Sequence, residues 1–157
     1  MKYGYAMEME HVTSYRATLA EPEVIGPVPE GLRINFHVTG GELHGPRIHG
    51  VLRPVGADWM LVRPDGVGIL DVRATLETGD GAVIYMSYAG VAEFGEEGYQ
   101  NLLNGAPSPT EGYDLKIRPT YQTSHPDYLW LNRAFCVGVG KAFPQKREVS
   151  YDVYRLG

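Results

Sequence analysis

The chain has 157 residues, a mass of 17.4 kDa and a formal net charge of −5 at pH 7. A chain of this length is expected to form one domain (1–157) around a single core. Its acidic balance disfavours nucleic acid, which binds to a basic face, and its longest nearly apolar run (82–92) is too short to span a membrane. The single cysteine, Cys136, excludes an internal disulfide and fits a reducing compartment. We therefore expect a cytoplasmic protein with neither nucleic acid nor membrane as a partner.

Short tyrosine-rich segments alternate with turns along the chain, which has 20 glycines, 11 prolines and 11 tyrosines. Aromatic and β-branched residues suit strands, whereas Gly and Pro suit turns. In chain order, strands are predicted at Tyr3–Arg16, Arg33–Thr39, Gly50–Pro54, Trp59–Arg63, Val67–Thr78, Ala82–Ala92, Tyr113–Thr120, Tyr128–Val139 and Glu148–Arg155. The Pro-rich connection 20–31 is expected to have little regular structure, and one short helix is expected at 99–103.

Two β-hairpins are predicted from turn chemistry. The sequence RPDG (63–66) joins two of the predicted strands, and TGDG (78–81) joins the second of these to a third; each has an Asp-Gly pair, which tolerates a positive φ. Closely spaced strands and turns are typical of a β-sandwich or a barrel. We predict an all-β fold: an antiparallel β-barrel of about eight or nine strands, of the lipocalin or allene oxide cyclase kind, with one short helix.

Alternation along the strands separates an apolar face from a polar one. Within 67–78 the even positions are apolar, and the odd positions include Asp71 and Arg73. Such a polar face is either solvated or, in a barrel of about eight strands, lines a cavity for one small molecule. Arginines and amphipathic aromatic residues within the same predicted strands favour the cavity, because they can orient a small polar or anionic group. These residues are Arg33, Arg63, Arg73, Arg118, Trp59, Tyr85, Tyr128 and Trp130.

Four stretches resemble the family catalogued as domain of unknown function 3237. They are VTGGELHGPRIHG (38–50), the hairpins from Gly56 to Gly90, IRPTYQTSHPDYLWLNRAFCVGVG (117–140) and the closing YDVY (151–154). The resemblance extends over nearly the whole chain, from Gly31 to Arg155. It implies a small antiparallel β-barrel with a cavity, often oligomeric, and implies little about chemistry.

Other motifs indicate architecture more than chemistry. The glycines of VTGGELHGP (38–46) lack P-loop spacing and precede a strand, so a bulge or tight bend is expected there. The five histidines have no recognisable metal-ligand spacing, and no metal or other cofactor is expected. His37 and His44 remain candidate general bases, since imidazole titrates near neutrality. Cys136, between Phe135 and Val137, is expected to be a small core residue.

The leading functional hypothesis is a cofactor-independent acid–base enzyme, an isomerase or lyase, acting on a small aromatic or enolisable carbonyl or carboxylate compound. A desolvated carboxylate can abstract a proton while Arg or Tyr stabilises the resulting anion. In this hypothesis Asp71 is the base, Tyr85 a proton donor and His37 a further catalytic candidate. The substrate-binding candidates are Arg33, Asp58, Trp59, Arg63, Arg73, Arg118, Tyr128, Trp130 and Asn132.

Two alternatives from other classes remain open. The same cavity would serve a non-catalytic small-molecule binding protein, or the polar positions would form a satisfied hydrogen-bond network in a structural oligomer. The pairs Asp71–Arg73 and Asp58–Arg63 would then be ordinary surface ion pairs. In each case we expect a homo-oligomer, most simply a dimer, because strand edges and a Pro-rich connector are common places for symmetric packing.

Overall fold

A computed structural model describes all residues, 1–157, and contains nine β-strands. The strands are β1 (Met9–Leu19), β2 (Glu23–Val28), β3 (Gly31–His44), β4 (Gly50–Val62), β5 (Val67–Thr78), β6 (Val83–Glu93), β7 (Tyr113–Gln122), β8 (Phe135–Phe143) and β9 (Glu148–Leu156). The helical segments are α1 (Gly98–Leu103) and the 3-10 helices η1 (Pro126–Arg133) and η2 (Pro144–Lys146). No helix is both long and apolar enough to cross a membrane.

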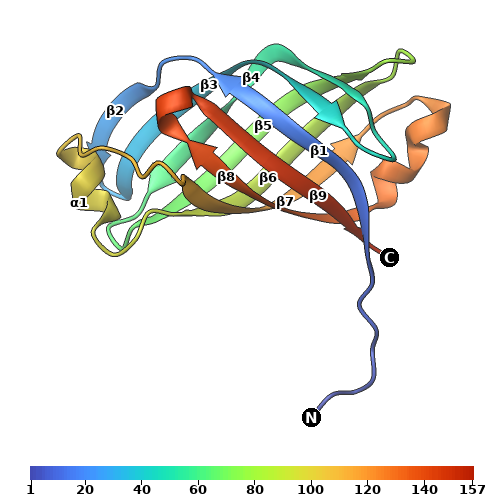
Figure 1. The fold of residues 1–157 in the computed structure, drawn as a ribbon, viewed down its shortest axis with the longest axis horizontal. Helices are drawn as coiled ribbons and strands as arrows, with labels where there is room; N and C mark the ends of the chain where they lie inside the picture. Colours follow the sequence, from blue (N-terminus) through green and yellow to red (C-terminus); the bar gives the residue numbers. More distant parts are fainter.

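Eight of the strands close into an antiparallel barrel (Figure 1). Neighbours follow the order β1-β9-β8-β7-β6-β5-β4-β3, and β1 pairs with the later part of β3 to complete the ring, while β2 pairs with the first part of β3. The predicted barrel is therefore confirmed, as is its short helix. Both Asp-Gly hairpins form, with Gly66 at φ 88° and Gly81 at φ 92°.

Several predicted element boundaries were wrong. The first strand begins at Met9, eight residues into the chain, and the connection 20–31 contains β2. Residues 50–62 form one bulged strand where two were predicted. The predicted strand 128–139 is split, because Pro126 starts a 3-10 helix whose first turn is capped by the His125 side chain, which accepts from the Asp127 amide. The strand pairing resumes only at Phe135.

Glycines permit the barrel to bend at two bulges. The pairing of β3 with β4 shifts register between His37 and Gly41, so the predicted bend at the 38–46 glycines is confirmed. In β4 the register shifts between Leu52 and Gly56. Gly56 has φ 95°, and a Cβ there would lie 2.1 Å from the Arg73 carbonyl oxygen, so only glycine fits. This bulge ends two residues before Asp58, the residue on which the site described below depends.

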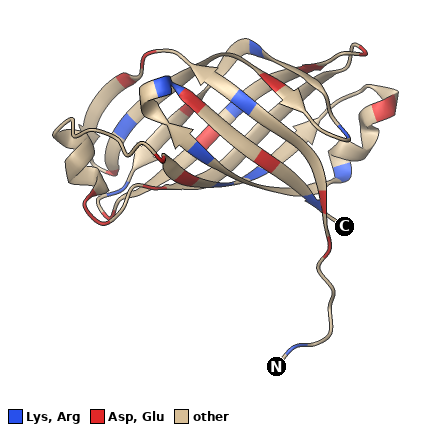
Figure 2. Ribbon diagram, viewed as in Figure 1, with Lys and Arg blue, Asp and Glu red and all other residues tan.

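The hydrophobic core occupies the inside of the barrel and closes one of its ends. Inward-facing side chains from all eight barrel strands are buried. At one end, η1 packs beside β7 and contributes the fully buried Leu131, and Cys136 is buried nearby as expected for a core residue. At the other end lie α1, β2 and η2 (Figure 1). Charged residues of both signs are interspersed along the strands and loops, as Figure 2 shows, with no face of one sign in this view.

Candidate functional site

A cavity of about 260 Å³ lies inside the barrel and opens toward the end that carries α1, β2 and η2. Twenty-three of its 29 lining residues are hydrophobic, so a bound molecule would contact mainly aliphatic and aromatic surface. Part of the wall is formed by Leu70, Val72 and Ala74, which belong to the even positions of β5 that alternation had grouped as an apolar face. Ser108, Tyr113, Pro144 and Arg147 are among the lining residues contributed outside or at the ends of the strands.

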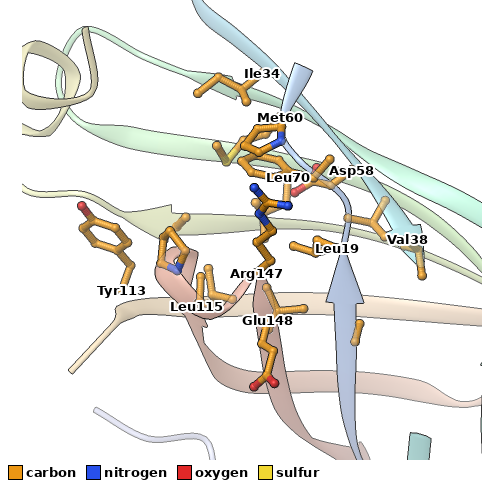
Figure 3. Close-up of a pocket in the computed structure, with 18 of the residues that line it drawn as sticks. Leu19, Ile34, Val38, Asp58, Met60, Leu70, Tyr113, Leu115, Arg147 and Glu148 are labelled. Atoms are coloured by element: carbon orange, nitrogen blue, oxygen red, sulfur yellow. The ribbon is translucent and has the colours of Figure 1, made fainter. Parts of the chain in front are cut away.

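Two carboxylates line this largely apolar cavity: Glu148, which pairs with Arg16, and Asp58 (Figure 3). Asp58 lies on β4 opposite Val72 of β5, on the face that also carries Met60 and Val62. Its Oδ1 accepts one hydrogen bond, from the Asp71 amide at 3.1 Å. Burial raises the pKa of Asp58 from 3.8 to about 7, with a smaller contribution from the Asp71 charge, and the Asp71 amide and Arg33 only partly oppose this shift. Asp58 can therefore both accept and donate a proton near neutral pH.

Three buried tyrosines form the polar counterpart of Asp58 inside the cavity. Tyr15, Tyr88 and Tyr151 all line it, and the ring of Tyr151 lies 5.0 Å from that of Tyr15 and 5.7 Å from that of Tyr88, measured between centroids. Burial is the largest cause that raises the pKa of each phenol, and the Asp58 charge raises the pKa values of Tyr88 and Tyr151 further. All three are neutral hydrogen-bond donors at pH 7.

The Tyr15 hydroxyl is buried and has no hydrogen-bond partner. Such a group costs free energy unless a partner is supplied. The Tyr15 hydroxyl is close enough to Tyr88 to lower the pKa of the Tyr88 phenol, which partly opposes the effect of burial. A ligand oxygen in the cavity would give the Tyr15 hydroxyl its partner. Asp58 and the three tyrosines together therefore provide one proton acceptor and several donors in a site that is shielded from water.

Asp58 is the one residue among the sequence-predicted candidates that lines this cavity. Asp71 and Arg73 lie on the outer wall, where their side chains are 57% and 50% exposed and form an ion pair of 2.9 Å. Tyr85 is 41% exposed on the outside of β6. His37 is also exposed and bonds to Glu23 at 2.8 Å. The expectation that these four residues face the cavity is wrong. The apolar even faces of β5 and β6 turn inward, and on β3 His37 lies on the exposed side while Phe36 and Val38 line the cavity.

The remaining candidates also lie outside the cavity. Arg33 donates to the Trp59 carbonyl oxygen at 2.7 Å, and the Trp59 ring is exposed on the outer face beside Arg73. Arg63 pairs with Asp65 in its own hairpin, not with Asp58, and Arg118 lies over the Phe135 ring at 4.8 Å.

Tyr128, Trp130 and Asn132 belong to η1 at the closed end, so they do not share a strand face. Tyr128 donates to Asp80 at 3.0 Å, and Asn132 exchanges two hydrogen bonds of 2.9 Å with the Thr123 backbone. The Trp130 ring packs against Arg47. These residues hold the closing segment in place and are not near the proposed proton-transfer group. No group of three or more His, Cys, Asp or Glu side chains is arranged to hold a metal ion.

Sequence reasoning missed the three tyrosines and Arg147. A usable signal existed for Asp58 and Tyr88: each shares an alternating face with apolar residues, Met60 and Val62 for the first, Ile84 and Met86 for the second. A single polar group on an otherwise apolar strand face is a group that folding carries into the core. Arg147 follows a 3-10 turn, for which strand alternation gives no prediction.

Comparison with known proteins assigns the family. The family model described as "Protein of unknown function (DUF3237)" matches residues 7–156. The chain belongs to this family. A UPF0311 protein from Rhodopseudomonas palustris strain TIE-1 is 32% identical over 84% of this chain and 86% of the relative, and one from Clostridium acetobutylicum is 29% identical over 88% and 89%.

Solved structures share the barrel. A beta-barrel like protein from Acinetobacter baumannii AYE has a TM-score of 0.84 at 31% identity, covering 99% of this chain and all of the other. A protein of unknown function from Clostridium acetobutylicum has a TM-score of 0.86 at 27% identity, covering 97% and 100%. An enzyme from Penicillium herquei has a TM-score of 0.71 at 18% identity, covering 100% and 99%, a likeness that shows the fold alone.

Proposed function

We propose that this protein is a cofactor-independent acid–base enzyme, an isomerase or lyase, acting on a small aromatic or enolisable carbonyl or carboxylate compound inside the barrel. One observation carries the proposal: a carboxyl group with a pKa of about 7 lies in an apolar cavity beside three buried tyrosines. Perturbed acids in clefts are typical of catalytic sites. The Penicillium herquei barrel is described as an enzyme, which is consistent with catalysis on this fold, although fold alone does not transfer function.

The proton transfers of an isomerisation balance without a co-reactant. The Asp58 carboxylate removes a proton from the carbon next to a carbonyl group, breaking that C–H bond, and the electron pair moves to the carbonyl oxygen as an enolate. Tyr88 and its neighbours donate hydrogen bonds to that oxygen. When the substrate carries a double bond one carbon further along (a β,γ-unsaturated carbonyl compound), the enolate is a conjugated dienolate. Asp58, now protonated, returns the proton to the γ-carbon as the double bond moves to the α,β position, so the carboxylate is regenerated and the substrate keeps its composition.

Deuterium exchange tests the chemistry without knowledge of the natural substrate. Phenylpyruvate and phenylacetone, one anionic and one neutral, both carry exchangeable protons next to a carbonyl group. Exchange in D₂O at pH 7, followed by proton NMR, should be accelerated over buffer by the parent protein. The Asp58→Asn variant should lose about 10²-fold or more of that acceleration.

Asp71→Asn is the matched control, because it removes a carboxylate from the outer face of the neighbouring strand. It should retain the full acceleration. Equal loss in both variants would argue against catalysis at Asp58. The largely apolar wall also favours a second candidate, a non-catalytic binding protein. This candidate predicts binding of both compounds and no accelerated exchange with any variant.

We further propose that the chain associates with itself, most simply as a dimer. Residues 1–8 extend away from the barrel (Figure 1), and every odd position in them is large and apolar: Met1, Tyr3, Tyr5 and Met7 are each at least 76% exposed. An alternating apolar segment without a surface to pack on is a feature of arms that contact a partner subunit.

A further inference from the structure

Arg147 occupies a distinctive backbone position at the open end of the cavity. It is the one residue other than glycine with a positive φ, at φ 52° and ψ 46°. Its amide donates to the Pro144 carbonyl oxygen at 3.1 Å, and its carbonyl oxygen accepts from the Leu19 amide at 2.8 Å. A large residue held in this sparsely populated conformation by bonds on both sides points to a function for its side chain.

The Arg147 guanidinium has no protein partner. It forms no ion pair and no side-chain hydrogen bond, and the adjacent acid, Glu148, bonds to Arg16 at 2.8 Å instead. Most other arginines are occupied by a carboxylate, a carbonyl oxygen or an aromatic ring. Figure 3 shows the Arg147 side chain extending from the rim into the cavity, toward the wall that carries Asp58 and Leu70. Arg147 is itself exposed, so its unpaired cation lies in contact with water at the mouth of a largely apolar cavity.

The unsatisfied donor of Tyr15 lies deeper in the same cavity. Tyr151, in ring contact with Tyr15, lies three residues beyond Glu148, the first residue of β9, which is roughly 10 Å along the strand. Apolar side chains line the space between these two polar ends. The complementary ligand carries a negative charge at one end, an oxygen atom at the other and an apolar body between them.

The cavity volume limits the size of that body. An apolar cavity of about 150 Å³ holds one benzene molecule, and the cavity here is about 260 Å³. It therefore has room for one ring with short substituents. We propose that Arg147 is the residue that selects anionic substrates, and that the substrate class is single-ring carboxylates whose second oxygen reaches Tyr15 and Asp58. This inference rests on the proposed use of the cavity as the binding site.

Phenylacetate and its neutral isostere phenylacetamide test the selection by binding alone, for example by NMR titration at pH 7.5. The parent protein should bind phenylacetate about tenfold more tightly than the amide. Arg147→Gly, which suits the positive φ, should lower phenylacetate affinity about tenfold and leave amide affinity within twofold. Arg147→Lys keeps the charge and should retain most of the preference.

Lys146→Ala is the matched control. Lys146 is a cation of the same turn, but its side chain does not line the cavity and lies over the Phe143 ring instead. It should leave both affinities within twofold. If the parent binds the two probes equally, the proposed selection of anions is wrong, but the proposed use of the cavity as a binding site is retained. A preference that survives in Arg147→Gly assigns selection to another cation and overturns the role of Arg147. Binding of neither probe removes the inference together with the proposed use of the cavity.

Discussion

The Asp58→Asn variant should be more stable toward unfolding than the parent at neutral pH, because the parent loses stability as pH rises and the variant does not. This gain comes although the substitution removes the proposed catalytic group. The pKa of Asp58 is raised from 3.8 to about 7 because burial disfavours its charge. Below pH 4 the carboxyl group is protonated in the folded and unfolded chains alike, so its ionisation does not change the free energy of unfolding. Between pH 4 and pH 7 only the unfolded chain loses the proton, so folding stability falls with pH.

The magnitude follows from the shift of about three pKa units. Each unit corresponds to 1.36 kcal/mol, so the parent should lose about 4 kcal/mol relative to the variant by pH 7, with no further change above it. The asparagine oxygen can still accept the hydrogen bond from the Asp71 amide, so packing is retained. Other titrating groups are common to both proteins and cancel in the difference.

Urea denaturation at pH 4 to 8, followed by tryptophan fluorescence, measures this difference directly. Asp71→Asn is the control: its carboxylate is exposed, and the variant should follow the parent curve closely. Parallel stability curves for the parent and Asp58→Asn would contradict a raised pKa, because they would mean that Asp58 titrates alike in the folded and unfolded chains.

Four further outcomes follow from the structure. Asp71→Asn combined with Arg73→Ala breaks an exposed ion pair and should change the free energy of unfolding by less than about 1 kcal/mol. Leu131→Ala empties the fully buried position in η1 and should cost about 2–5 kcal/mol, measured by urea denaturation. Ala74→Leu adds bulk to the cavity wall and should abolish phenylacetate binding by NMR. Deletion of 1–8 should lower the solution mass measured by light scattering from that of an oligomer toward that of the single chain; a parent mass of 17.4 kDa would contradict self-association.

Local patterns were sufficient to predict the barrel but not to orient its walls. Strand alternation in 67–78 and the Asp-Gly turns carry enough information to predict the hairpins, because both depend on neighbouring residues alone. Alternation separates two faces without saying which one is inside. A barrel of eight strands has an interior that side chains nearly fill, so the apolar face with Leu70 and Val72 turned inward, and Asp71 and Arg73 remained in water.

The parts of the site that sequence could not supply depend on contacts between distant segments. Tyr15 and Tyr151 meet because β1 pairs with β9, a register that only barrel closure determines. The pKa of Asp58 depends on burial by the surrounding strands, which no local pattern contains. The position of Arg147 requires a 3-10 turn between β8 and β9 and a left-handed residue after it. The strand prediction at Tyr128 failed for a local reason, since Pro126 and the His125 cap favour a helix start.

The proposed function requires that Asp58 exchanges protons near neutral pH inside the cavity. Carbon-13 NMR of the aspartate side chains, with Asp58→Asn to assign the signal, measures that pKa directly in the folded protein. We expect a midpoint of about 7, shifted when phenylacetate occupies the cavity. A midpoint near 4 that does not change when phenylacetate is added would contradict this role, because Asp58 would then be charged throughout the neutral range and would not contact a molecule in the cavity.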